Sequence, residues 1–110
     1  MLAILAVCTD LFFIVKIQDA ARRAGFDVKF SKTADDLTDA PLVVVDLNCR
    51  DLDVIALIRA IKSTSTIPVL GFLSHVEADL AKSAKEAGCD RVLARSAFSS
   101  RGADILKEMT

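Results

Sequence analysis

The sequence predicts a doubly wound α/β fold, in which a five-stranded parallel sheet carries helices on both faces. Two observations lead to this fold class. Hydrophobic residues make up 53% of the 110 residues and the mean hydropathy is +0.43, which indicates strands that are buried on both faces. Short apolar runs also alternate along the chain with segments of helical periodicity, as in consecutive βα units. The length fits one domain, residues 1–110.

The first βα unit is the most clearly marked. Met1–Val7 is an apolar run that suits a buried strand, and Thr9 or Asp10 can cap the helix that follows. Gly25 is a typical helix stop. The residues expected on the core face of this helix are Phe13, Ile17, Ala20, Ala21 and Ala24.

The next two strands differ in pattern. Phe26–Phe30 alternates apolar and polar residues, which predicts an edge strand, and a short helix is expected at Ala34–Thr38. Pro41 then introduces Leu42–Leu47, an apolar β-branched run that predicts the central strand, with Asp46 near its carboxyl end.

The second half of the chain continues the alternation. Its expected elements are a helix with Val54, Leu57, Ile58 and Ile61 on one stripe, ended by Lys62–Thr66; a strand at Ile67–Leu73; a helix at Glu77–Ala87, stopped by Gly88; a strand at Arg91–Ala94; and a helix at Ala103–Met109.

Composition argues against several classes of protein. The longest apolar runs, Met1–Cys8 and Leu11–Val15, are far shorter than the ~20 residues of a membrane-spanning helix. The first residues lack the basic segment of a secretory signal, so we expect a cytoplasmic protein. The net charge is −1 and the basic residues are scattered, which argues against nucleic-acid binding.

Cysteine and histidine content argues against a metal centre. The three cysteines, Cys8, Cys49 and Cys89, form no C-x-x-C pair and are interpreted as reduced thiols, buried rather than redox-sensing. His75 is the only histidine, and no zinc-ligand spacing accompanies it.

In a parallel sheet of this kind, chemistry collects beyond the carboxyl ends of the strands. Four segments are expected to meet at that edge, namely Cys8–Asp10, Asp46–Asn48, Ser74–His75 and Arg95–Ser96.

Two groups of motifs point to a known family. The first is Leu42–Asn48 followed by Asp51-Leu-Asp53 and an amphipathic helix, and the second is Ile67-Pro-Val-Leu-Gly71, Ala84-x-x-Ala-Gly-Cys-Asp90 and Val92-Leu-x-Arg95. In this order and spacing they resemble the receiver domain of bacterial response regulators over essentially the whole chain. The resemblance implies a flavodoxin-like fold with strand order 2-1-3-4-5 and a role in two-component signalling.

The resemblance also implies a phosphorylation chemistry, in which an aspartate attacks a phosphoryl group with the help of a divalent cation and a lysine. Asp46 falls on the phospho-acceptor position, and Asn48 falls where a backbone carbonyl reaches the metal. The acidic pair that holds the metal aligns with Cys8 and Thr9, whereas Asp10 lies one place late.

The remaining positions of that site also depart from the pattern. Leu73 holds the position of the hydroxyl that senses the phosphoryl group, with Ser74 directly after it. Arg95 stands at the lysine position and Ser96 at the usual proline, while Val92 replaces the aromatic reporter. We therefore expect a degenerate receiver, or pseudo-receiver, that has no resident cofactor and acts by protein–protein interaction.

Two interpretations of Asp46 remain open. It can be a structural carboxylate that bonds loop N–H groups or pairs with Arg95, which we favour. Alternatively, the domain is a working phosphorelay receiver that binds magnesium through Asp10, Asp46 and Asn48, with Ser74 as the hydroxyl.

The first helix points to a partner. Ile14 and Val15 fall on the solvent side of the predicted helix, unless a terminal segment covers them or the helical phase is shifted by one residue. The expected partner is a histidine kinase, an output domain or a second copy of the chain. Small-molecule binding ranks last, because the turn after the first strand lacks a phosphate cradle, and no conventional enzyme site is recognisable.

Overall fold

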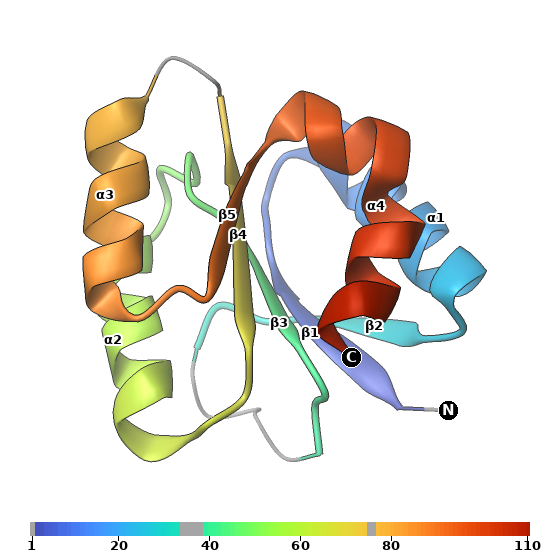
Figure 1. Ribbon diagram of the computed structural model, residues 1–110, viewed down its shortest axis with the longest axis horizontal. Helices are drawn as coiled ribbons and strands as arrows, with labels where there is room; N and C mark the ends of the chain where they lie inside the picture. Colours follow the sequence, from blue (N-terminus) through green and yellow to red (C-terminus); the bar gives the residue numbers. More distant parts are fainter. Residues whose placement is uncertain (1, 34–38, 75–76) are drawn as a thin grey trace.

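The computed structural model describes residues 2–33, 39–74 and 77–110, which form a single sheet with helices on both faces (Figure 1). The fold class and the strand order are confirmed: the strands are all parallel, in the order β2-β1-β3-β4-β5. The helix expected at Ala34–Thr38 lies outside the described residues. The strands are β1 (Ala3–Val7), β2 (Asp27–Phe30), β3 (Val43–Asp46), β4 (Val69–Leu73) and β5 (Arg91–Ala94).

Two helices cover each face of the sheet. Helices α1 and α4 pack together on one face, while α2 and α3 lie on the other (Figure 1). Their bounds are α1 (Leu11–Ala24), α2 (Val54–Thr64), α3 (Ala78–Ala87) and α4 (Arg95–Met109). Among the described residues, no helix has the length and apolar character needed to cross a membrane.

Alternation along the strands divides the core in two. Leu5, Val43 and Val69 point toward α2 and α3, whereas their neighbours Ile4 and Val44 point toward α1 and α4. Because both faces of the central strands are covered, every residue of β3 and β4 is buried, which explains their unbroken apolar runs.

Three phenylalanines form the centre of the α1–α4 core. Phe13 of α1 stacks on Phe72 of β4 with their ring centroids 4.2 Å apart. Phe98 of α4 lies 5.5 Å from Phe13 and 5.7 Å from Phe72, centroid to centroid. This cluster joins the starts of both helices to the carboxyl end of β4.

Helix ends follow the sequence signals closely. The Asp10 carboxylate accepts hydrogen bonds from the Phe12 and Phe13 N–H groups, so Asp10 rather than Thr9 caps α1. Gly25 ends that helix with a φ of 90°, a left-handed conformation that glycine adopts without steric cost.

The last helix departs from the prediction, since α4 begins at Arg95 and not at Ala103. The intervening segment is rich in serine, which lowers its helix propensity and hides the helix in the sequence. Burial of Phe98 against the aromatic cluster stabilises this first part of α4. At Arg101 the backbone leaves the helical region (φ −131°), so the helix is kinked there.

We predict that Phe98→Ala lowers the free energy of unfolding by about 3–5 kcal/mol, because it empties the centre of the aromatic cluster. The matched control is Phe12→Ala, the same substitution at a side chain that is 86% exposed, which should change stability by less than about 0.5 kcal/mol. Urea unfolding followed by circular dichroism measures both. Equal losses in the two variants would contradict this description of the core.

Candidate functional site

The carboxyl ends of β1, β3 and β5 meet at one edge of the sheet, the upper edge in Figure 1. Asp46 is the last residue of β3, Asp10 follows β1 and Arg95 follows β5. The side chains of these three residues are in direct contact. The sequence placed all three at this edge and offered a pair between Asp46 and Arg95, but it gave no sign of the pair between Asp10 and Arg95.

Arg95 bridges the two carboxylates. Its Nη2 lies 3.0 Å from Asp46 Oδ2 and its Nη1 lies 3.1 Å from Asp10 Oδ2. The Asp46 side chain is only 3% exposed, whereas that of Asp10 is 36% exposed. A buried carboxylate requires a compensating cation or several hydrogen bonds, and Arg95 supplies the cation.

Two rings of the aromatic cluster pack against the guanidinium of Arg95. The Cζ atom of Arg95 lies 5.1 Å from the ring centroid of Phe13 and 5.8 Å from that of Phe72. Guanidinium groups are attracted to the faces of aromatic rings at this distance. The core packing and the charge bridge therefore support each other.

The other oxygen of Asp46 is also occupied. Asp46 Oδ1 accepts a hydrogen bond of 3.0 Å from the backbone N–H of Asn48. On the Oδ2 side, the Cys8 thiol makes a weaker contact at 3.8 Å. Both oxygens of the Asp46 carboxylate are thus engaged within the chain.

Asn48 links the end of β3 to the end of β4. Its side-chain oxygen accepts a 3.0 Å hydrogen bond from the Ser74 N–H, and its Nδ2 donates a 2.7 Å hydrogen bond to Glu77 Oε1. The sequence placed Asn48 and Ser74 at this edge but missed Glu77, whose only signal was its position before α3. His75 lies outside the described residues, and Leu73 is buried.

Electrostatics favour the charged form of the bridge. Desolvation lowers the pKa of Arg95, but Asp46 and Asp10 outweigh it and raise that pKa above its usual value. Desolvation raises the pKa of Asp10, but hydrogen bonds from Arg95, Phe13 and Phe12 outweigh it and leave the pKa below its usual range. At neutral pH the bridge therefore consists of a cation and an ionised Asp10.

Burial favours the uncharged form of the neighbouring Cys8 thiol. Desolvation raises the pKa of Cys8 to about 11, with the nearby carboxylates adding to it, so the group is a neutral thiol at physiological pH. Cys49 lies at the same edge, where its Sγ contacts Thr9 Oγ1 at 3.5 Å. All three cysteines are free and buried.

The side chains at this edge do not fit a magnesium ion. Hard cations take oxygen ligands, ideally carboxylates, but the two residues between β1 and Asp10 are Cys8 and Thr9, which carry a thiol and a hydroxyl. Asp10 and Asp46 direct their Oδ2 atoms at Arg95, and the Asn48 side-chain oxygen accepts from Ser74. Within the described residues, no cluster of three or more histidine, cysteine, aspartate or glutamate side chains is arranged to hold a metal.

The expected partner surface on α1 requires a correction. Ile14 is half-buried and packs against the α1–α4 core, so it does not belong to the exposed face, whereas Val15 is 63% exposed. The sequence interpretation began the helical phase at Phe13 and left out Leu11 and Phe12, which are 77% and 86% exposed. Extending the helix back to its Asp10 cap would have placed both on the solvent side.

Solved structures show what this fold is. The chain is similar to a response regulator receiver domain from Methanospirillum hungatei (15% identity, TM-score 0.81, covering 98% of this chain and 92% of that one). A receiver domain from Clostridium thermocellum gives 15% identity and a TM-score of 0.82, with 99% and 94% covered. The BeF3-activated DrrB receiver domain gives 20% identity and a TM-score of 0.83, with 99% and 97% covered.

The chain has the fold of a response regulator receiver domain. The sequence itself matches no family model and no curated protein. At 15–20% identity the receiver fold is shared, whereas the residues of the site must be judged by their own chemistry.

We predict that the buried arm of the Arg95 bridge couples more strongly than the exposed arm. In double-mutant cycles, Arg95→Met with Asp46→Asn should give an interaction energy of about 1–3 kcal/mol. Arg95→Met with Asp10→Asn should give a clearly smaller interaction energy, because that carboxylate is partly exposed and Asn keeps the helix cap. Urea unfolding measures both cycles, and the reverse order of coupling would contradict the geometry.

We also predict that Cys8 resists alkylation in the native protein. Its rate with iodoacetamide should rise by roughly tenfold per pH unit up to a pH of about 11, because only the thiolate reacts. Peptide mapping after timed labelling measures the rate, and the urea-unfolded protein is the control. Fast native labelling of Cys8 at neutral pH would show that the thiol is neither buried nor neutral.

Proposed function

We propose that the domain is a receiver-like signalling module of two-component type that is not switched by phosphorylation and acts through protein–protein contacts. The observation that carries this proposal is the Arg95 bridge. It occupies the Oδ2 atom of Asp46, the phospho-acceptor position implied by the resemblance, together with an oxygen of Asp10.

The bridge works against phosphoryl transfer in two ways. An aspartate that attacks a phosphoryl group must present a free oxygen, but Asp46 Oδ2 is paired with Arg95 and its Oδ1 accepts from Asn48. The repulsion between carboxylate and phosphoryl group must also be offset by a cation that can reach both. Arg95 is already shared between two carboxylates, and its fork geometry differs from the point charge of a lysine.

The end of β4 supports the same proposal. The resemblance to receiver domains implies that a hydroxyl after the fourth strand would bind the new phosphoryl group. Here Leu73 is buried, and the Ser74 N–H is bonded to Asn48. The ends of β3 and β4 are thus linked without a phosphoryl group, which favours one constant conformation.

A function through protein–protein contacts is consistent with the receiver fold of the molecule. Receiver domains are signalling modules whose partners are kinases and output domains, and we propose partners of this kind for this chain. The site offers neither an activated nucleophile–base pair nor a phosphate cradle among the described residues, so we do not propose an enzyme. A cytoplasmic location follows from this role and remains part of the proposal.

The test is phosphorylation with acetyl phosphate or phosphoramidate in the presence of magnesium, read as intact mass. We predict no adduct on the wild-type protein, and no magnesium-dependent rise of its melting temperature. An adduct on the wild type that is absent from Asp46→Asn would instead establish a working phosphorelay receiver, with Asp10 as the next metal ligand to test.

A gain-of-function variant makes the negative result informative. Cys8→Asp combined with Arg95→Lys restores an acid next to Asp46 and frees that carboxylate from the guanidinium. This variant should bind magnesium, which would raise its melting temperature, and should acquire the phosphoryl adduct. Arg95→Lys alone is the matched control, because it frees Asp46 without supplying the missing acid.

A further inference from the structure

An exposed apolar surface lies on the first half of α1. Among the described residues, four large hydrophobic side chains are exposed, and three of them, Leu11, Phe12 and Val15, belong to this helix. Their spacing of one and four residues places them on one side of the helix, opposite the buried Phe13 and Ile17. We call Leu11, Phe12 and Val15 the α1 patch.

The second half of the same helix is basic. Its only acid, Asp19, is shared between two arginines, with Oδ1 2.8 Å from Arg22 Nη2 and Oδ2 3.0 Å from Arg23 Nε. One carboxylate compensates only one of these cations. Lys16 donates to the neutral hydroxyl of Ser99 at 3.3 Å and so keeps its full charge. Three cations against one carboxylate leave α1 with a net charge of +2.

The neighbouring helix α4 does not remove this charge. A hollow of about 220 Å³ between the two helices is bordered by Lys16, Asp19 and Arg23 of α1 and by Arg101 and Asp104 of α4. The two α4 side chains carry opposite charges, so they leave the excess of α1 in place. An acidic side chain of a partner can therefore approach Lys16 and Arg23 beside this hollow.

The Arg95 bridge adds one net negative charge at the start of α1, because a single cation is shared by Asp10 and Asp46. Asp10 directly precedes the helix, whereas Arg22 lies in its last turn, about 18 Å away at 1.5 Å per residue. Physiological salt screens exposed charges that are more than about 8 Å apart. The exposed side of α1 is thus apolar at its start and basic toward its end.

The distribution of charge distinguishes the possible occupants of this surface. A second copy would set the net positive charge of α1 against itself. A membrane would have to accept the carboxylate of Asp19, which follows Val15 by four residues and lies on the same face of the helix. A partner protein that is apolar over one part of its contact face and acidic over the next complements both halves of α1.

We infer that α1 binds a helix of a partner protein, in which apolar side chains cover the α1 patch and acidic side chains pair with Lys16 and with the arginine that Asp19 leaves uncompensated. A helix fits because the exposed side of α1 is a narrow strip about 21 Å long, and paired helices bury strips of this shape. The inference rests on the proposed function, because a domain that signals by contact requires a contact surface, and it adds the chemistry of the partner.

The area of the α1 patch indicates a weak, reversible contact. Three side chains exposed by 63% to 86% present apolar surface on the order of 400 Å², within the range of functional patches on monomers. Stable complexes bury about 800 Å² on each partner. The exposed ion pairs add little affinity, but they select the sign of the partner's charge.

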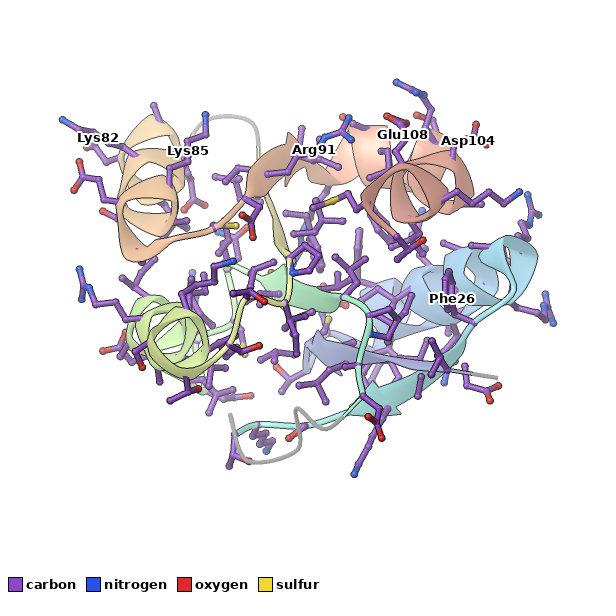
Figure 2. The ribbon with its side chains drawn as sticks, turned by 60° about the horizontal axis from the view of Figure 1, so that its bottom comes forward. Phe26, Lys82, Lys85, Arg91, Asp104 and Glu108 are labelled. Carbon is purple, nitrogen blue, oxygen red and sulfur yellow. The ribbon has the colours of Figure 1, made fainter. Side chains whose placement is uncertain are left out.

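The charged face formed by α3, β5 and α4 is the rival surface for an acidic partner. Lys82 and Lys85 lie on α3, Arg91 lies on β5, and the acids Asp104 and Glu108 lie on α4 (Figure 2). Arg91 is already paired with Glu108 at 3.3 Å. None of the exposed large hydrophobic side chains among the described residues belongs to these three elements. This face therefore offers charge without apolar area, and Lys85 is a suitable control position.

The test is an NMR titration of the isotope-labelled domain with two synthetic helical peptides. Both are about as long as α1 and present leucines over their first half. The second half carries glutamates in one peptide and lysines in the other. We expect the glutamate peptide to shift the amide signals of α1 and to bind at least about tenfold more tightly than the lysine peptide.

Variants separate the two halves of the surface. Phe12→Ala should weaken binding of the glutamate peptide by about tenfold, because an exposed aromatic at the centre of a small interface carries much of its energy. Lys16→Glu should weaken it by about fivefold, whereas Lys85→Glu, the matched control on α3, should leave it unchanged. Unchanged melting temperatures would show that the variants are folded.

Three outcomes of the titration would overturn the inference: no binding of either peptide, equal binding of both, or shifts confined to α3 and α4. Binding to phosphatidylserine vesicles that is lost in Phe12→Ala would assign the surface to a membrane instead. A dimer that is lost in the same variant would assign it to a second copy. None of these experiments contains a phosphodonor, so failure here is distinguishable from failure of the proposed function.

Discussion

The bridge from Arg95 to Asp46 and Asp10 is the interaction on which the rest of this edge of the molecule depends. It exists because parallel strands β1, β3 and β5 all end on the same side of the sheet, so that residues far apart in sequence reach one another. Without Arg95, a nearly fully buried carboxylate would lack its only cationic partner among the described residues. The stacked rings of Phe13 and Phe72 support the guanidinium, and therefore the packing of α1 against the sheet and the neutralisation of Asp46 are parts of one arrangement.

The same bridge separates the fold from the chemistry usually associated with it. The receiver fold needs only apolar strands and helices with suitable faces, and those survive at 15–20% identity. Phosphoryl transfer needs a free carboxylate, a metal held by further acids and a compact cation, all placed within a few ångströms. In the function proposed here, a guanidinium that pairs with both carboxylates leaves neither Oδ2 atom unpaired and supplies the positive charge that a metal would otherwise bring. Cys8, a neutral thiol beside Asp46, is consistent with a site in which Arg95 balances the charge of the carboxylates.

The sequence determined the fold well and the details of the site less well, for physical reasons. Unbroken apolar runs such as Leu42–Val45 mark strands buried on both faces, and glycines at the ends of α1 and α3 mark left-handed caps. Both signals are local. The start of α4 was missed because serine-rich Ser96–Ser100 has weak helix propensity, and only the tertiary burial of Phe98 stabilises it. The sequence offered the pair between Asp46 and Arg95. The Asp10–Arg95 and Asn48–Glu77 contacts depend on side-chain directions beyond the strand ends, for which sequence spacing gives no rule.

Asp10 connects this site to the surface of the molecule. One of its oxygens accepts from the Phe12 and Phe13 N–H groups and so starts α1, while the other is held by Arg95. Leu11 and Phe12 follow directly, and their exposure is set by where the helix begins. In a phosphorylated receiver, a change at the aspartate would have to travel to such a surface. Here the guanidinium of Arg95 holds Asp10, and Asp10 caps α1, so Leu11 and Phe12 are presented in one constant position. With the function that we propose, such a domain offers a contact surface continuously, so its output would depend on its abundance and on competition between partners.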